Sequence, residues 1–158
     1  MLDYIKSVCG QIGAALKKKD SFHSVVLRST VVPGTARSVA IPILEDCSGK
    51  TAGIDFGFGN NPEFLRESTA IYDYFNPPRI VIGALDKRTV EAVRLLYKDI
   101  DAPVVIADID VVEGIKYARQ KGLNTPIFGS LLAANDEQVR RAHQMGVHSG
   151  KKKMASDE

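Results

Sequence analysis

The chain of 158 residues lacks both a long apolar run and an excess of one charge. Its longest apolar stretches, such as residues 80–82 and 103–107, are far shorter than the roughly 20 residues that a membrane helix needs. The 21 Lys and Arg residues nearly balance the 19 Asp and Glu residues, which leaves a formal net charge of +2. This balance gives no long-range field that would attract nucleic acid. We therefore predict neither a membrane-spanning protein nor a nucleic-acid-binding protein.

Cysteine is scarce and tryptophan is absent. Cys9 and Cys47 form no Cys-x-x-Cys pair, and no apolar leader follows Met1, a pattern typical of the reducing cytoplasm. Neither cysteine has a histidine nearby in sequence that would make it a nucleophile. The three histidines show no metal-ligand spacing, so we predict no metal site. The chain is therefore expected to be a cytoplasmic protein without a metal.

The composition is that of an ordinary folded domain, with 44% hydrophobic and 25% charged residues. Two lysine triplets, 17–19 and 151–153, are the only runs of one charge. The first closes a predicted helix, where cations suit the helix dipole. The second lies in the basic tail 148–158, which is expected to be flexible. Both triplets are interpreted as solvated surface.

In the first third of the chain, the apolar pattern predicts a helix, a strand and a second helix. Asp3 would cap the first helix, whose apolar positions form one stripe: Ile5, Val8, Ile12 and Leu16. The β-branched stretch 24–32 predicts a strand buried on both faces. A helix is expected over 35–46, and Pro42 should kink or split it.

In the middle of the chain, alternation predicts a strand over 54–58. Asn61 as cap and Pro62 as first helical residue predict that a helix begins there. Glu63 and Glu67 would lie in its opening turn, four residues apart on one helix face.

The next part of the chain alternates strands and helices. Strands are predicted over 79–83 and 103–107, and a helix over 110–120 that Gly122 would end. Between the two strands, Asp86 would cap a helix whose buried face carries Val90, Val93 and Tyr97.

The alternation of strands and helices predicts an α/β fold with a largely parallel sheet. A dinucleotide-binding sheet normally begins with a strand and a Gly-x-Gly-x-x-Gly turn. This chain begins with a helix, and no such turn occurs in it. We therefore expect an incomplete doubly wound, Rossmann-like sheet followed by helices.

Three features could carry chemistry. Thr30 lies near the end of a predicted strand, where open α/β sheets bind ligands, although its hydroxyl could instead hold the turn. Glu63 and Glu67 near a helix start could accept a proton beside a bound sugar, or could simply compensate the helix dipole. Lys116 on a mostly apolar helix could stabilise an oxyanion, or could be an ordinary surface lysine.

Four motifs, taken in their order along the chain, favour the functional interpretation of these features over the structural one. They are RSTVVPGT (28–35), ILEDCSGK (43–50), NPEFLRESTAI (61–71) and VIG (81–83). Together they resemble the nucleotide-sugar 6-dehydrogenases, the family that oxidises UDP-glucose and GDP-mannose, and most of all its GDP-mannose-oxidising members. The likeness runs from about residue 2 to 118, and the Asn-Pro-Glu-Phe-Leu element is highly specific.

The resemblance implies a reaction and a set of site residues. Members of the family use two NAD to oxidise the primary alcohol of the sugar, through an aldehyde and a cysteine thioester, to a uronate for polysaccharide synthesis. The implied catalytic residues are Thr30, Glu63 and Lys116. The implied cofactor-binding residues are Thr30 and Glu67, and the implied substrate-binding residues are Phe64, Leu65 and Arg66.

The chain also departs from the family pattern. The Gly-rich pyrophosphate element and the Gly-Gly-Ser-Cys nucleophile element are absent, and Gln120 stands where the family has asparagine. Residues 124–132, continuing to 139, resemble a much later helix of the family. We therefore expect an NAD-binding remainder (1–109), a helical remnant of the dimerisation or linker region (110–147) and the tail (148–158).

These departures leave three hypotheses for the chain alone. The first is an enzyme remnant without turnover, in which NAD binding is weakened. The second is a non-catalytic interaction module whose helices over 110–122 and 128–146 bind a full-length homologue or a second copy. The third is a fragment that still binds a nucleotide sugar through residues 61–67. Under all three, an exposed sheet edge predicts marginal stability.

Overall fold

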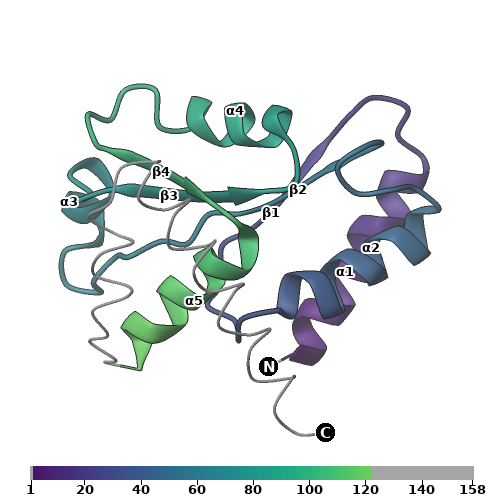
Figure 1. Ribbon diagram of the computed structural model, residues 1–158, viewed down its shortest axis with the longest axis horizontal. Helices are drawn as coiled ribbons and strands as arrows, with labels where there is room; N and C mark the ends of the chain where they lie inside the picture. The colour runs from purple at the N-terminus through teal and green to yellow at the C-terminus, as the bar shows by residue number, and fades with distance from the viewer. Residues whose placement is uncertain (1, 122–158) are drawn as a thin grey trace, which may run out of the picture.

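The computed structural model describes residues 2–121, which form an open four-stranded sheet with helices on both faces (Figure 1). The elements, in chain order, are α1 (Leu2–Lys17), β1 (Ser24–Leu27), the π-helix η1 (Ala36–Ala40), α2 (Ile41–Ser48), β2 (Gly57–Asn60), α3 (Ala70–Phe75), β3 (Ile80–Ala84), α4 (Lys87–Leu95), β4 (Val104–Ala107) and α5 (Ile109–Gln120). The predicted elements beyond residue 121, with the end of the last helix at Gly122, lie outside the described residues.

The sheet has the strand order β1-β2-β3-β4. β1 pairs with β2 and β3 pairs with β4 in parallel, whereas β2 and β3 are antiparallel. The predicted α/β class and the open sheet are confirmed. The expectation of a largely parallel sheet needs one correction, because its central pairing makes the sheet mixed.

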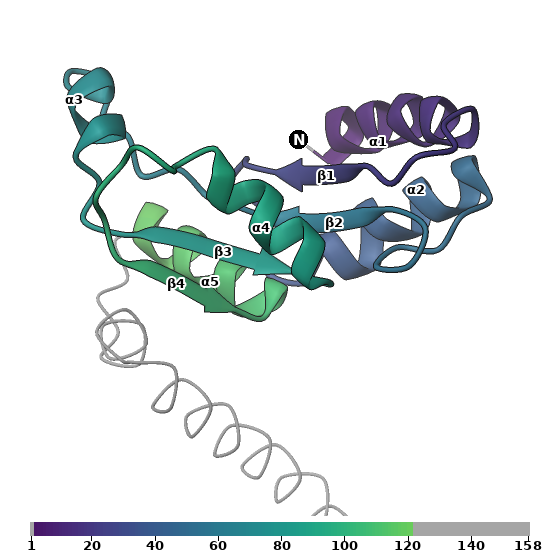
Figure 2. The same ribbon diagram turned by 90° about the horizontal axis from the view of Figure 1, so that it is seen from above.

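The helices form layers on the two faces of the sheet. α4 covers one face, and α5 and α2 lie on the other, with α1 packed against α2 (Figures 1 and 2). One apolar cluster lies between β3 and α4 and includes Ile82, Val93 and Tyr97. A second joins β3 to α5 through Val81 and Val112. None of the helices within residues 2–121 is long and apolar enough to cross a membrane.

The first strand is much shorter than predicted. It ends at Leu27, and all four of its residues are only partly buried. The ladder with β2 stops after Asn61 donates its N–H to the Leu27 carbonyl oxygen. The rest of the stretch 28–32 is therefore loop, despite its apolar character.

The second strand lies three residues later than predicted, over Gly57–Asn60. Ile54, expected inside the strand, is 67% exposed and belongs to a turn in which the Gly53 N–H donates to the Phe56 carbonyl oxygen. A Cβ atom at Gly57 would lie 1.8 Å from Oγ1 of Thr89 on α4. Close helix approach, rather than apolar alternation, therefore explains the glycines of this strand.

The first two helices follow their predictions with local changes. Pro42 splits the second one: the π-helix η1 ends at Ala40 and an α-helix begins at Ile41. In α1, Asp3 lies inside the first turn rather than at the cap. Val8 is exposed, and Cys9 takes its place in the buried stripe. The helices α1 and α2 pack so closely that a Cβ at Gly13 would approach the Cys47 Cβ to 2.6 Å.

From residue 80 to 120 the predictions are confirmed to within a residue or two. The Asp86 side chain caps α4 by accepting a hydrogen bond from the Thr89 N–H. Val90, Val93 and Tyr97 are buried as expected. Asp108 caps α5 in the same way, by accepting from the Asp110 N–H.

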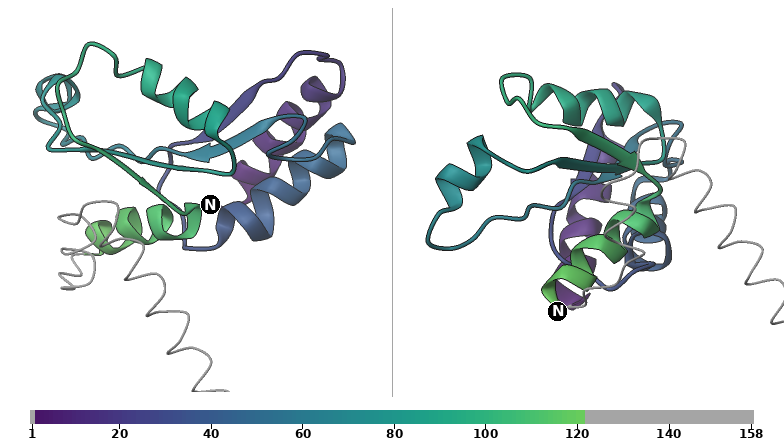
Figure 3. Two further views of the ribbon diagram at one scale, coloured as in Figure 1. Left: turned by 45° about the horizontal axis from the view of Figure 1, so that its top comes forward. Right: turned by 60° about the vertical axis from the view of Figure 1, so that its left-hand side comes forward.

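The helix predicted to begin at Asn61 is wrong. Residues 61–66 have no regular secondary structure, residues 67–69 form a turn, and the helix α3 begins only at Ala70. Figure 3 shows that this segment leads from the sheet to α3, which stands at the end of the molecule away from α1 and α2. Glu63 and Glu67 therefore do not share a helix face.

Candidate functional site

Two loops leave the sheet side by side where β1 and β2 end. Leu27 and Asn60 are paired in the parallel register. Thr30 and Glu63 each follow three residues after this pair, so both loops start from the same edge of the sheet. Open α/β sheets bind ligands beyond this edge, at the carboxyl ends of parallel strands.

Glu63 and Lys116 meet at this edge, although 53 residues separate them in sequence. Nζ of Lys116, on α5, lies 2.9 Å from Oε1 of Glu63 and also donates a hydrogen bond to the Glu63 carbonyl oxygen. The lysine side chain is 14% exposed and the glutamate side chain 36% exposed. The fold thus brings together two residues that the resemblance implied to be catalytic.

The surroundings keep Glu63 ionised. Burial acts to raise the pKa of Glu63, but the hydrogen bonds from Lys116 and from the Leu65 N–H lower it below its ordinary value. The positive charges of Lys116 and Arg28 act in the same direction. A carboxylate with a lowered pKa is a weak proton acceptor, so this geometry favours orientation of a polar ligand over general-base action.

The backbone donors of the same segment already have carboxylate partners. The Leu65 N–H donates to Oε2 of Glu63 at 2.8 Å, and the Arg66 N–H donates to Oδ2 of Asp73 at 3.0 Å. The Arg66 guanidinium also pairs with Asp73, at 2.7 Å from Oδ1. These bonds lower the pKa of Asp73 well below its usual range. A ligand that takes these N–H groups must displace a carboxylate.

Asn61 anchors the start of this segment instead of capping a helix. Its side chain is 1% exposed. Nδ2 donates to the Val81 carbonyl oxygen at 2.9 Å, and Oδ1 accepts from the Tyr97 hydroxyl at 2.6 Å. These tertiary bonds turn the amide toward Val81 and Tyr97, so it does not cap a local helix.

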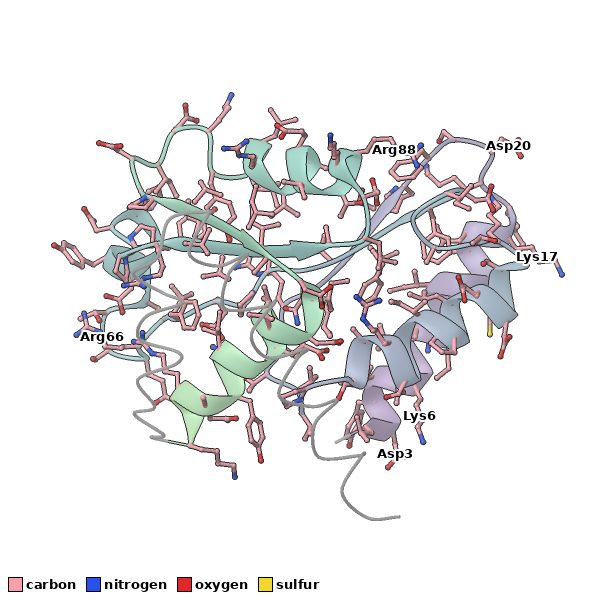
Figure 4. The ribbon with its side chains drawn as sticks, viewed as in Figure 1. Asp3, Lys6, Lys17, Asp20, Arg66 and Arg88 are labelled. Atoms are coloured by element: carbon pink, nitrogen blue, oxygen red, sulfur yellow. The ribbon has the colours of Figure 1, made fainter. Side chains whose placement is uncertain are left out.

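A cavity of about 240 Å³ opens beside the segment, and Asn61, Glu63 and the three implied substrate-binding residues Phe64, Leu65 and Arg66 line it. Among the described residues, its lining includes four arginines, Arg28, Arg66, Arg79 and Arg119, but only two carboxylates, those of Glu63 and Asp73. Arg119 and Lys116 both lie over the Phe64 ring, at 5.1 and 5.3 Å from its centre. In Figure 4 Arg66 projects at the α3 end of the molecule, far from Arg88. The charge of the cavity suits an anionic ligand.

The loop after β1 is held from α5 by Glu113, a residue that the sequence interpretation did not select. Thr30 itself is half-buried. Four residues later the Gly34 N–H donates to Oε2 of Glu113 at 2.6 Å, and the Ala36 N–H donates to Oε1 at 2.8 Å. Burial raises the pKa of Glu113, and these two N–H groups act against that rise. An acid three residues before Lys116 on an apolar helix was the available signal.

The remaining predicted positions contribute less to this edge. Glu67 is exposed in the turn before α3, and Gln120 is the exposed last residue of α5. Thr35, rather than Thr30, holds the turn after β1, since its hydroxyl donates to the Val32 carbonyl oxygen at 2.6 Å. Within residues 2–121, no group of three or more His, Cys, Asp or Glu side chains could hold a metal ion.

The open sheet and the polar loops at the carboxyl ends of β1 and β2 define an α/β domain of the doubly wound class. The model of the UDP-glucose/GDP-mannose dehydrogenase family, NAD binding domain, matches residues 1–101, and the chain belongs to this family. The resemblance predicted from the four motifs is thereby confirmed.

Individual relatives agree with this assignment. GDP-mannose 6-dehydrogenase of Pseudomonas aeruginosa is 56% identical over 116 residues, which are 73% of this chain and 27% of that protein. UDP-glucose 6-dehydrogenase AglM of Haloferax volcanii is 38% identical over 140 residues, 85% of this chain and 32% of that protein. The chain therefore spans about a quarter to a third of the length of these curated relatives.

Solved structures show the same relationship. A ternary complex of GDP-mannose dehydrogenase from Pseudomonas aeruginosa is similar with a TM-score of 0.75 and 53% identity, covering 77% of this chain and 28% of that one. A UDP-glucose dehydrogenase from Pyrobaculum islandicum is similar with a TM-score of 0.69 and 36% identity, covering 75% and 27%.

Proposed function

We propose that this chain carries the sugar-oriented corner of an NAD-dependent nucleotide-sugar 6-dehydrogenase whose substrate is GDP-mannose. The observation that supports this most is the contact between Glu63 and Lys116, at 2.9 Å across 53 residues of sequence. The family and the 56% identity to a GDP-mannose 6-dehydrogenase supply the substrate class. The product of the complete reaction is the uronate.

Each site residue has a role that its chemistry supports. The ionised Glu63 orients a water molecule or a sugar hydroxyl, and its lowered pKa suits this better than proton abstraction. The Lys116 ammonium stabilises negative charge on the reacting oxygen. The Thr30 hydroxyl, on the neighbouring loop, holds the same water toward the cofactor. Phe64, Leu65 and Arg66 hold the substrate by their backbone in the arginine-lined cavity.

The described residues fit the nicotinamide end of NAD and not its pyrophosphate. Thr30 offers a hydroxyl beyond β1, and Glu67 offers an exposed carboxylate beyond β2. The sequence of 158 residues contains no Gly-x-Gly-x-x-Gly motif, the element that binds the diphosphate in dinucleotide-binding sheets. When bound, NAD supplies the hydride acceptor. Weak binding of the cofactor is therefore expected.

The two cysteines are not placed to form a thioester at this site. Cys9 is buried in α1 and Cys47 lies on α2, and neither is among the described residues that line the cavity beside Glu63. Covalent catalysis needs a nucleophile within reach of the reacting carbon. We therefore propose that these 158 residues bind the nucleotide sugar without oxidising it.

Titration calorimetry with GDP-mannose tests this proposal. The wild-type chain should bind, and Lys116→Met should weaken binding by about tenfold, the effect of losing about 1.4 kcal/mol. Lys121→Met, the same substitution at the end of the same helix, is the matched control and should bind like the wild type. A flat titration of the folded wild type would overturn binding. NADH formation above that of Glu63→Gln would overturn the lack of turnover.

A second proposal is association with a second copy or a full-length homologue in the cytoplasm. One observation favours it: among the described residues the outer edge of β1 has no partner strand, and Tyr4 and Val8 on α1 are 81% and 52% exposed. Unpaired strand edges and exposed apolar side chains promote association. A monomer by sedimentation at micromolar concentration, with no capture of a full-length homologue, would contradict it.

The predicted domain boundaries, between residues 109 and 110 and between residues 147 and 148, stay a prediction.

A further inference from the structure

Glu113 is the only acidic or basic side chain that is buried within residues 2–121. It is 1% exposed, on the face of α5 that packs toward the sheet and η1. No lysine or arginine of the described residues forms an ion pair with it. A buried carboxylate without a cation is costly unless several donors satisfy it. Whether Glu113 can stay ionised therefore depends on the hydrogen-bond donors that it contacts.

Those contacts are backbone N–H groups of the loop after β1. Oε2 accepts from Gly34 at 2.6 Å, and Oε1 accepts from Ala36 at 2.8 Å. Gly34 has a φ of +88°, a conformation that side-chain-bearing residues rarely adopt, and η1 begins two residues later, at Ala36. The carboxylate thus binds the loop at the glycine with a positive φ, four residues beyond Thr30.

The same helix also holds the loop after β2. Lys116 follows Glu113 by three residues, a spacing that places two side chains on neighbouring turns of one helix face, roughly 5–6 Å apart at their Cβ atoms. Glu113 binds the loop with Thr30, and Lys116 binds Glu63. One rigid turn of α5 therefore separates the attachment points of the two loops.

We propose that Glu113 is a positioning residue, whose carboxylate sets the place of the Thr30 loop relative to Lys116 and Glu63. This inference rests on the proposed function, because the spacing of these three residues matters only if they act on one ligand. The alternative is that Glu113 only stabilises the start of η1 and α2. A purely stabilising role predicts a lower melting temperature and an unchanged ligand affinity below it.

The experiment compares Glu113→Gln and Glu113→Asp with Val112→Ala, a buried neighbour on α5 that belongs to the apolar cluster with Val81 of β3. Val112 is fully buried, so its truncation destabilises the same helix and serves as the matched control. Residual dipolar couplings of the full chain, measured well below every melting temperature, report the orientation of the amides of residues 30–36 against α5. Calorimetry with GDP-mannose reports the consequence for binding.

The two glutamate variants should reorient the amides of residues 30–36, and amide exchange at Gly34 and Ala36 should accelerate by about tenfold or more. The dissociation constant for GDP-mannose should rise several-fold in Glu113→Gln, and Glu113→Asp, one methylene shorter, should recover part of the loss. Val112→Ala should leave both readouts unchanged. Comparable affinity in Glu113→Gln and Val112→Ala would overturn the positioning role.

The dipolar couplings and the calorimetry together separate the failure of this inference from the failure of the proposed function. If the wild-type chain does not bind GDP-mannose, the proposed function fails and the dipolar couplings alone decide the placement of the loop. Wild-type orientation of residues 30–36 in both glutamate variants would then overturn the inference. If Glu113→Gln does not fold, Glu113→Asp is judged by the same two measurements.

Discussion

The loop after β1 and the segment after β2 leave the same edge of one sheet but are attached to α5 in opposite ways. Glu113, 1% exposed, holds the first through two backbone N–H groups. Lys116 holds the second through the half-exposed carboxylate of Glu63. Both contacts join residues that are more than 50 positions apart in sequence.

This difference indicates that the loop after β1 is the more rigid side of the site and the segment after β2 the more adaptable one. A buried hydrogen bond such as that from Ala36 breaks only when the structure opens, so we expect the β1 loop to be held at this point. The bonds of residues 63–66 are exposed or only partly buried, and a ligand can exchange with them. The Leu65 and Arg66 N–H groups already bind carboxylates, and an anionic substrate group can take the place of those carboxylates.

The largest test of this comparison removes the buried anchor. Glu113→Ala leaves the buried Ala36 N–H and the partly buried Gly34 N–H without their partner, which should lower the free energy of unfolding by about 2–4 kcal/mol. Chemical denaturation measures this change. A loss below that of Lys116→Met would show that the β1 loop is not the better anchored of the two.

The next effect concerns the buried start of the adaptable segment. Asn61→Ala removes the partner of the Val81 carbonyl oxygen and of the Tyr97 hydroxyl, and should cost about 2–3 kcal/mol. Tyr97→Phe removes only one of these bonds and should cost about 1 kcal/mol. Denaturation of both variants checks the order. Equal losses would mean that the bond to Val81 contributes nothing.

A smaller effect is expected from the half-exposed ion pair. Lys116→Met should lower the free energy of unfolding by at most about 1 kcal/mol, because solvent screens the pair. Its effect on ligand binding should be larger than its effect on stability. A loss as large as that of Glu113→Ala would erase the distinction between the two attachments.

The smallest effect should depend on pH. The pKa of Asp73 is lowered by the Arg66 side chain and N–H, so the unfolded chain binds a proton at Asp73 before the folded chain does. The stability that Asp73 contributes is present above about pH 4, the ordinary range of the carboxyl, and is lost as the pH falls below it. Thermal melts of the wild type and Asp73→Asn should therefore differ at pH 7, and the difference should shrink steadily as the pH is lowered from 5 to 3, without vanishing while the pH stays above the lowered pKa of Asp73. A constant difference across this range would contradict the lowered pKa.

How far the sequence sufficed also differs between the two halves of the molecule. From residue 80 onward the strands and helices were predicted, because local signals decide them: Asp86 caps α4 with its own side chain, and Val90 and Val93 are buried at helical spacing. Before residue 80, β2 was misplaced and a helix was predicted at Asn61. Both errors arose where a distant element, α4 or Tyr97, uses the residue in question.

For the site, sequence motifs named Thr30, Glu63 and Lys116 but could not show which residues hold them. The one local signal at Glu113, an acid on an apolar helix three residues before Lys116, does not show that its side chain is buried. Its burial depends on η1, which is 77 residues away at the Ala36 contact. Similarly, local spacing predicted Glu63 and Glu67 on one helix face, whereas the structure places Glu63 against α5 and leaves Glu67 exposed.

The sequence by itself determined the α/β class, the helices with side-chain caps, the apolar strands β3 and β4, and the family, because these depend on residues close together along the chain. Only the tertiary structure decided the mixed sheet, the irregular segment over 61–66 and the paired anchors on α5. The physical reason is that a polar group takes the partner that the whole fold brings within hydrogen-bond distance. Asn61, Glu63 and Glu113 all found theirs in elements that the chain reaches later or left earlier.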